Sequence, residues 1–320
     1  MSLPNKAAQQ AVKDELAAKD ARIEQLEQQL KDARKAKHTL PAGTKRKSSK
    51  TDFIRLIVPD THGCHIDKKW AAALFGDIEQ LDIKQVVHLG DALECGSFLA
   101  QHHTLGYVSQ VSDKHYTFED DVSATNSLFD KLQELCPGAE FHYMEGNHEH
   151  RIQKYCVTTA KKSGTAYPQK EAEALMRIYG PEHVLHLKKR GINYYQQGKQ
   201  YMGLPLMAMI KLGKCHFVHG ISTSQNAAKA HLDKVGGNVV YGHTHRMDSF
   251  HSRTIASGGI GAWSPGCGCM LQPLYLNQHF STWQQGFGVQ LVASDGSFLH
   301  INVPVSKGKS YLTLLTEKLT

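Results

Sequence analysis

Short apolar runs alternate along the chain with amphipathic stretches, and five of the runs end close to a glycine that is flanked by Asp, Asn or His. These five runs are Phe53–Val58, Val86–Leu89, Phe141–Met144, Cys215–Val218 and Val239–Tyr241. A short apolar run bounded by turn-forming residues is typical of a buried strand. We therefore expect strands that deliver polar side chains at their carboxyl ends.

The stretches between these runs carry apolar residues at helical spacing. The pattern predicts helices over 68–75, 118–135, 151–160, 169–179 and 222–232, and it extends the second strand to 83–89. In 118–135, Phe118, Val122 and Phe129 fall on one side of the helix. Strands that alternate with helices indicate an α/β protein with a sheet flanked by helices.

Near the end of the chain, two alternating runs flank a turn signal. They are 288–292 and 298–303, and Asp295-Gly296 lies between them. Asp-Gly between alternating runs is a strong hairpin signal. We expect this hairpin to belong to a second, antiparallel-leaning sheet.

Residues 6–33 form a predicted helix with a heptad pattern. Leu16, Ile23 and Leu30 take the first seam position and Val12, Leu26 and Ala33 the second, while Gln9 and Lys19 interrupt the seam. One interpretation is a coiled coil through which the protein self-associates. The other is a solvated helix, because about four heptads with two polar seam positions are only marginally stable.

The basic character of the chain is concentrated in one tract. The formal net charge is +7, and residues 34–50 hold seven Lys and Arg with no acidic residue. Basic residues, Pro41 and Gly43 without an apolar period indicate a linker over 34–51. The expected organisation is thus a helical extension (1–33), a linker (34–51) and a globular domain (52–320). The tract either contacts a nucleic-acid backbone or serves only as a tether.

Cysteine usage and hydropathy bear on the compartment. The seven cysteines are odd in number and scattered, and Cys267 and Cys269 are the only close pair. This pattern favours a reduced, intracellular protein. No apolar stretch approaches the ~20 residues that span a bilayer, and the N-terminus lacks a signal-peptide pattern. We expect a cytoplasmic protein without a membrane partner.

The polar residues at the strand ends form a set with metal-binding chemistry. The set is Asp60, His62, Asp91, Asn147, His219, His243 and His245. Loops at the carboxyl ends of strands converge in α/β sheets, so we expect one site at the end of a sheet. Oxygen and nitrogen donors suit Mn²⁺, the favoured ion, with Fe, Zn, Ni or Co as alternatives. Seven donors exceed what one catalytic ion needs, and they fit two divalent ions about 3.5–4 Å apart.

In order, the motifs read Asp-x-His, Gly-Asp, Gly-Asn-His-Glu, His-Gly and Gly-His-Thr-His, and this pattern resembles the calcineurin-like metallophosphoesterase superfamily over 53–250. The resemblance implies a two-sheet sandwich covered by helices. It implies one metal on Asp60, His62 and His245, a second on Asn147, His219 and His243, and Asp91 as the bridge. A metal-bridging hydroxide would attack phosphorus, and His148 would protonate the leaving oxygen.

Two further segments bear on the class of phosphoesterase. Protein Ser/Thr phosphatases of this superfamily extend the second motif with an Arg that grips phosphate, whereas Gly90–Gly96 here contains none. This departure disfavours protein dephosphorylation. The segments 266–270 and 283–288 are similar to phage-encoded and bacterial phosphoesterases described as DNA-repair-like.

Several residues near the motifs have two interpretations. Arg246 and Arg151 either bind a substrate phosphate or pair with a carboxylate. Trp283 either stacks on a base or is buried under the hairpin. Cys267 and Cys269 either bind a third metal or simply pack, and packing is favoured. His102 and His103 are weaker candidates for the site.

These observations predict a dinuclear-metal phosphoesterase, in particular a phosphodiesterase or nuclease that acts on nucleic acid or nucleotides. A phosphomonoesterase that acts on nucleotides or small metabolites is the enzyme alternative. The alternative from another class is a coiled-coil scaffold whose phosphoesterase body is inactive.

Overall fold

The computed structural model describes residues 6–38, 52–96, 117–198, 200–201, 204–205, 208–255, 258–273 and 280–316. The chain divides into two compact units, Met1–Ser48 and Ser49–Thr320. We call the second unit the body.

The first unit contains one long helix, α1 (Lys6–His38). It continues five residues beyond the predicted helix 6–33, into the segment predicted as a linker; the rest of that segment, 39–51, lies outside the described residues. The seam residues Leu16, Ile23, Leu26 and Leu30 are 48–55% exposed. Among the described helices, none has the length and apolar character that a membrane crossing requires.

Within the described residues of the body, seven strands form the first sheet in the order β14-β13-β12-β1-β2-β3-β4. Their bounds are β1 Phe53–Val58, β2 Ile83–His88, β3 Glu140–Met144, β4 Ile192–Tyr195, β12 Gly286–Val292, β13 Phe298–Ser306 and β14 Lys309–Ser310. Strands β1 to β4 run parallel, and β12 pairs antiparallel with β1.

Parallel neighbours need long crossovers, and helices provide them here. The helices of this half are η1 Gly63–His65, α2 Lys68–Ile78, α5 Phe118–Leu135, α6 Asn147–Lys162, α7 Pro168–Tyr179, α8 Pro181–Val184 and α9 Leu187–Arg190. The predicted helix 151–160 is the interior of α6, which begins four residues earlier at a predicted metal ligand. A capping box starts α5: Thr117 Oγ1 accepts from the Asp120 N–H, and Asp120 Oδ2 accepts from the Thr117 N–H.

The second sheet has the order β10-β11-β9-β8-β7. Its strands are β7 Met209–Leu212, β8 Cys215–Val218, β9 Val239–Tyr241, β10 Met247–Thr254 and β11 Gly258–Pro265. The helix α10 (Ala227–Val235) packs on it, and the chain also forms the short pair β5 (Gln200–Tyr201) and β6 (Leu204–Pro205) and a terminal helix, α11 (Tyr311–Thr316).

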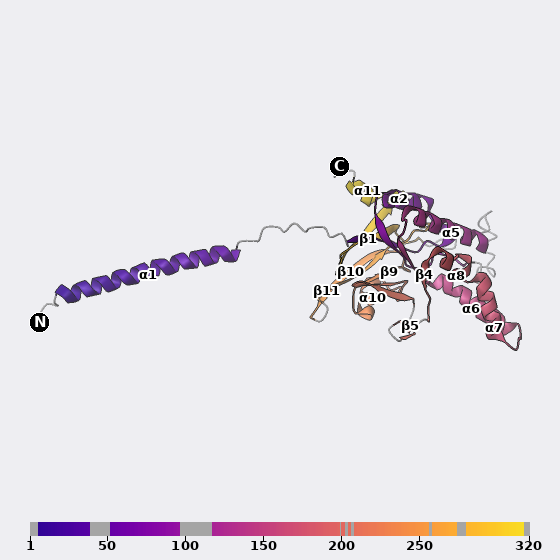
Figure 1. Cartoon of the computed structure of the whole chain (residues 1–320), viewed down its shortest axis with the longest axis horizontal. Coiled ribbons are helices and arrows are strands. Elements are labelled where there is room, and N and C mark those ends of the chain that lie inside the picture. Colours follow the sequence, from indigo (N-terminus) through magenta and orange to yellow (C-terminus); the bar gives the residue numbers. More distant parts are fainter. Residues whose placement is uncertain are drawn as a thin grey trace. The chain divides into compact units, whose positions relative to one another are not determined.

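Alternation along the strands builds the layers of the body. Leu56 and Val58 of β1 face α2, α5 and α6, whereas Ile57 between them faces Phe217 and Val240 of the second sheet. In Figure 1, α2 and α5 lie on one side of the strands and α10 on the other. The fold is a mixed α/β structure of two packed sheets flanked by helices, as predicted.

The strand assignment differs from the prediction in two places. The predicted hairpin is present as β12 and β13, but it extends the first sheet because β12 pairs with the edge of β1. The second sheet is built instead from β7 to β11. Its β10–β11 hairpin escaped prediction because Gly258, Gly259 and Gly261 give β11 the composition of a loop.

Candidate metal centre

The candidate centre lies where strands of both sheets end, and not at the end of one sheet as predicted. The two sheets pack face to face, so the carboxyl ends of β1, β2 and β3 lie beside those of β8 and β9. These ends carry Asp60 and His62 after β1, Asp91 after β2, Asn147 and His148 after β3, His219 after β8, and His243 and His245 after β9. All eight side chains are brought to this one region, as the following contacts show.

Asp60, His62 and His245 form the first group of donors. His62 Nε2 lies 2.9 Å from His245 Nε2, and His245 Nε2 lies 3.1 Å from Asp60 Oδ2. The second oxygen, Asp60 Oδ1, is buried without a hydrogen-bond partner in the described residues. Two ring nitrogens and a carboxylate crowded together inside the protein fit a divalent cation, which would satisfy all of them.

Asn147, His219 and His243 form the second group. Asn147 Oδ1 lies 2.9 Å from His219 Nε2, and the His219 and His243 rings are 5.0 Å apart. His219 Nδ1 lies 3.0 Å from the carbonyl oxygen of Leu89, to which it donates. With Nδ1 committed to that carbonyl, Nε2 is the nitrogen that would face a metal ion, as a histidine ligand requires.

Asp91 lies between the two groups. A carboxylate oxygen of Asp91 is within 4.8 Å of the donor atoms of Asp60 and His62, and likewise of those of His219 and His243. Asp91 Oδ2 is 3.3 Å from His219 Nε2. This position between two donor groups is the one a bridging carboxylate needs.

Four of the donors have a left-handed backbone. The φ angles are 53° at His62, 48° at Asp91, 68° at His243 and 54° at His245. Such a conformation costs a residue other than glycine about 1–3 kcal/mol and concentrates at functional sites. The packing of the body therefore holds these donors in positions that their own backbone preferences oppose.

The glycines beside the donors allow close approach. A Cβ atom at Gly146 would overlap Asp91 Oδ1, and one at Gly242 would overlap Asp60 Oδ1. These two glycines are therefore required by carboxylates that follow other strands.

Sequence reasoning missed the role of Glu94. Its Oε2 lies 2.6 Å from His62 Nδ1 and 3.4 Å from His148 Nδ1, and the side chain is buried. A carboxylate behind a ligand histidine fixes the ring so that its other nitrogen faces the metal. Glu94 lies within Gly90–Gly96, and its place three residues after Asp91 is the signal that the sequence offers for this role.

Glu149 and Asp121 are also buried carboxylates that organise the loops. Glu149 accepts from the N–H groups of Asp91, Leu93 and Gly146 at 2.8–3.1 Å. Asp121 accepts from the N–H of Glu94 at 2.9 Å. The sequence signal for the role of Glu149 is its place directly after His148. The sequence around Asp121 carries no signal for its role.

Charge in the centre follows from these contacts. Burial would raise the pKa of Asp91, but His148 and His219 outweigh it and hold that pKa well below its usual range. Burial, assisted by His148, lowers the pKa of His62 to about 4, so this imidazole is neutral at pH 7 and suited to bind a metal. Burial opposes protonation of His148, yet Asp91 and Glu94 outweigh it and raise its pKa to about 9.

His148 is therefore protonated at neutral pH, as a general acid must be before it acts. Its Nδ1 lies 2.6 Å from the carbonyl oxygen of Glu94, while Nε2 lies 3.7 Å from Asp91 Oδ2. Its backbone N–H donates to Asp91 Oδ1 at 2.8 Å. The ring is thus directed toward the bridging carboxylate.

The predicted substrate contacts lie in different surroundings. Arg151 Nη1 and Nη2 each lie 2.8 Å from a ring nitrogen of His148. Arg246 Nη2 donates to the carbonyl oxygen of Ser224 at 2.6 Å. The half-buried ring of Trp283 meets the His245 ring edge to face at 4.1 Å, so this tryptophan adjoins the centre. His102 and His103 lie outside the described residues.

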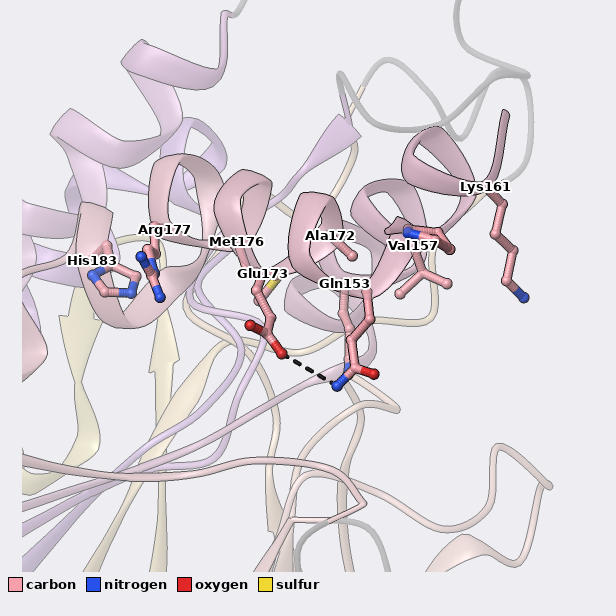
Figure 2. Close-up of a pocket in the computed structure, with 10 residues that line it drawn as sticks. Gln153, Val157, Lys161, Ala172, Glu173, Met176, Arg177 and His183 are labelled. Atoms are coloured by element: carbon pink, nitrogen blue, oxygen red, sulfur yellow. Dashed lines mark hydrogen bonds between the residues drawn. The ribbon is translucent and has the colours of Figure 1, made fainter. Parts of the chain in front are cut away.

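A separate hollow of about 620 Å³ is formed by α6, α7 and α8 (Figure 2). Figure 2 shows Val157, Met176 and Arg177 along it. Within α7, Gln169 Nε2 donates to Glu173 Oε1 at 3.3 Å. None of its lining residues belongs to the predicted metal or substrate set. The hollow is therefore distinct from the candidate centre.

No protein-family model matches the sequence, and no curated protein matches it either. Among solved structures, the chain is similar to vacuolar protein sorting 29 from Cryptosporidium parvum, with 10% identity, a TM-score of 0.41 and coverage of 81% of this chain and 94% of that one. It is similar to hypothetical protein PH1004 from Pyrococcus horikoshii, with 12% identity, a TM-score of 0.38 and coverage of 83% and 94%.

A further similar structure is YfcE, a phosphoesterase from E. coli, with 14% identity, a TM-score of 0.31 and coverage of 78% of this chain and 98% of that one. With identities this low and TM-scores below 0.5, nothing about the chemistry of this chain follows from these likenesses. The two-sheet fold is established by its own strand pairing.

Proposed function

We propose that this chain is a dinuclear-metal phosphodiesterase that acts on nucleic acid or nucleotides. One observation carries the proposal: donors from five strand ends, 185 positions apart at most, meet in two groups with Asp91 between them. The motif resemblance to calcineurin-like metallophosphoesterases supports the same chemistry.

In this proposal Asp60, His62 and His245 would hold one ion, Asn147, His219 and His243 would hold the other, and Asp91, which lies between the two groups, would serve both. Mn²⁺ suits the oxygen and nitrogen donors, and Fe, Zn, Ni and Co are alternatives. Two bound cations supply a nucleophile at neutral pH and neutralise charge on a phosphoryl group.

The protein's own residues prepare the leaving group and orient the site. His148 carries the proton for the leaving oxygen. The backbone hydrogen bond from His148 to Asp91 couples the acid to the bridging carboxylate. Glu94 holds both His148 and His62, so the acid and the first donor group share one support.

Preference for diesters rests on three sequence features. Gly90–Gly96 lacks the phosphate-gripping Arg, the tract 34–50 is basic, and the segments 266–270 and 283–288 are similar to the DNA-repair-like phosphoesterases of phages and bacteria. Trp283 beside His245 gives an aromatic surface on which a base can stack.

The test compares bis-p-nitrophenyl phosphate with p-nitrophenyl phosphate in the presence of added Mn²⁺, Fe²⁺, Zn²⁺, Ni²⁺ or Co²⁺, one metal at a time. We expect a higher kcat/KM for the diester. A higher kcat/KM for the monoester would establish the phosphomonoesterase alternative, and no hydrolysis with any of the five metals would favour the scaffold. Single- and double-stranded DNA, RNA and cyclic nucleotides then define the substrate.

We also propose that α1 mediates self-association. A second copy would cover the half-exposed apolar seam of this helix, which consists of Leu16, Ile23, Leu26 and Leu30. All seven cysteines are free, which supports a reducing compartment such as the cytoplasm.

A further inference from the structure

The segment Cys267-Gly268-Cys269 runs beside the loop that carries Asp60 and His62. The Gly268 N–H donates to the carbonyl oxygen of Asp60 at 2.8 Å, and the Asp67 N–H donates to the carbonyl oxygen of Gly268 at 3.0 Å. Met270 N–H donates in turn to His65 O at 2.9 Å. These backbone bonds fix the register between the cysteine segment and the first group of donors.

Isolated bridges join Cys267 to Asp60 and Cys269 to Ile66. Gly268 between them lies against the indole of Trp70, which a Cβ atom there would overlap. Both thiols are buried and free of disulfide bonds.

The sulfur of Cys269 lies within 4.8 Å of a ring nitrogen of His62 and of one of His245, and those two nitrogens also lie within 4.8 Å of each other. Cys269 and His62 are 1% exposed and His245 is 6% exposed. Nitrogen and sulfur ligands of one zinc ion are roughly 3–4 Å apart, so small side-chain adjustments would bring these three onto one ion. Asp60 Oδ1 is buried without a hydrogen-bond partner in the described residues, which leaves a polar atom here that a cation would satisfy.

We propose that Cys269 supplies a thiolate ligand to the metal position of Asp60, His62 and His245, and so selects a borderline ion such as Zn²⁺ at that position. The inference rests on the proposed metal centre. Thiolate ligation favours Zn²⁺ over Mn²⁺, whereas the all-oxygen-and-nitrogen group of Asn147, His219 and His243 still accepts Mn²⁺. The thiol proton is released to solvent when the ion binds.

This assignment changes two expectations from the sequence. The donor set contained no thiolate, and Cys269 was expected to pack in the core. The sequence separates Cys269 from His62 by more than two hundred positions, so only the backbone bonds to the Asp60–Asp67 loop reveal their proximity.

The test is Co²⁺ substitution in the full chain, because thiolate ligation gives an intense near-ultraviolet sulfur-to-cobalt charge-transfer band that oxygen and nitrogen ligands do not give. We expect the band in the wild type and in the matched control Cys267→Ala. We expect its loss in Cys269→Ala and in the nearly isosteric Cys269→Ser. Thermal unfolding of each variant verifies that it is folded.

A second measurement is competition of Zn²⁺ against Mn²⁺ at equilibrium, read as metal content. Cys269→Ser should lower the preference for Zn²⁺ at one of the two positions at least tenfold, while Cys267→Ala leaves it unchanged. If a folded Cys269 variant keeps both the band and the preference, the thiolate assignment is wrong.

The outcomes also separate this inference from the proposed function. A wild type that hydrolyses diesters and binds Co²⁺ without the band overturns the thiolate and leaves the phosphodiesterase intact. A wild type that shows the band but hydrolyses no phosphate ester supports the thiolate and overturns the phosphodiesterase. A chain that binds no Co²⁺, Zn²⁺ or Mn²⁺ overturns both.

Discussion

His148 contributes two separate groups to the centre, and substitutions can distinguish them. Its ring is the proposed acid, whereas its backbone N–H orients Asp91 and survives any side-chain change. His148→Ala should therefore lower kcat about 10²–10⁴-fold, the usual contribution of a general acid, with metal content retained. Asp91→Ala should lose metal and activity together. Assays of kcat with metal analysis check both, and full activity in either variant would contradict the site assignment.

Glu94 contacts the proposed metal ligand His62 and supports it from behind, so a substitution at Glu94 tests that supporting role. Glu94→Gln removes the charge behind His62, so metal affinity should fall about 10–100-fold, as for other carboxylates that orient ligand histidines. Excess metal should restore much of the activity. Glu140→Gln is the matched control, because Glu140 lies 3.3 Å from His142, a histidine outside the centre. Equal metal affinity in the Glu94→Gln and Glu140→Gln variants would show that Glu94 does not support metal binding.

At the scale of elements, the turn between β3 and α6 passes close to Asp91, the candidate donor that lies between the two groups. Gly146 has φ −88°, which alanine adopts freely, so damage from Gly146→Ala would come from its Cβ and not from the backbone. That Cβ would displace Asp91, and we expect loss of at least one metal and of activity. Metal content of the purified variant is the measurement.

Gly76 provides the control for that substitution. It lies exposed within α2, and a Cβ there meets nothing within 4 Å. Gly76→Ala should keep metal and activity and raise the free energy of unfolding by about 0.5–1 kcal/mol, because alanine favours the helix. A Gly146→Ala protein with full metal content would show that the turn tolerates a side chain.

Oligomeric state belongs to the whole molecule. If α1 pairs through its seam, the full chain should be a dimer, and Leu16→Asp with Ile23→Asp should give a monomer at the same concentration. Ala21→Asp, on the opposite face by the heptad pattern, should leave the dimer intact. Size-exclusion chromatography with light scattering measures the mass. A monomeric wild type, or a double variant that stays dimeric, would exclude α1 as the interface.

The stability of the metal-free molecule should depend on pH. Burial opposes protonation of His219, but Asp91 and Asp60 outweigh it and raise its pKa from 6.5 to about 10. Folded His219 therefore binds a proton that the unfolded chain releases above pH 6.5, so its stabilising contribution is full below that pH and is lost as pH rises toward 10. The raised pKa of His148 acts in the same direction.

We accordingly expect a lower Tm at pH 8.5 than at pH 6.5 when metal has been removed with EDTA. Bound cations supply the positive charge that the protons supply in the metal-free centre. The Tm of the metal-loaded protein should therefore fall less between pH 6.5 and pH 8.5. Thermal unfolding of both forms is the measurement. A metal-free Tm that is equal or higher at pH 8.5 would contradict this charge assignment.

The sequence by itself determined the strands that carry the donors, because each is a short apolar run that ends close to a glycine. It also picked out the seven candidate donors, since their residue types and order are visible in the chain whatever the distance between them. The helices between the strands followed from apolar spacing, and so did the α/β class.

Only the tertiary structure decided which sheet each strand joined and which buried groups support the donors. The hairpin of β12 and β13 extends the first sheet because the edge of β1 is free to pair, and no local pattern records that edge. Glu94 and Cys269 approach His62 through the packing of the β2 loop and the Cys267–Cys269 segment against the Asp60 loop. Such contacts depend on how distant segments pack, whereas hydrophobic periodicity records only which face of each element is buried.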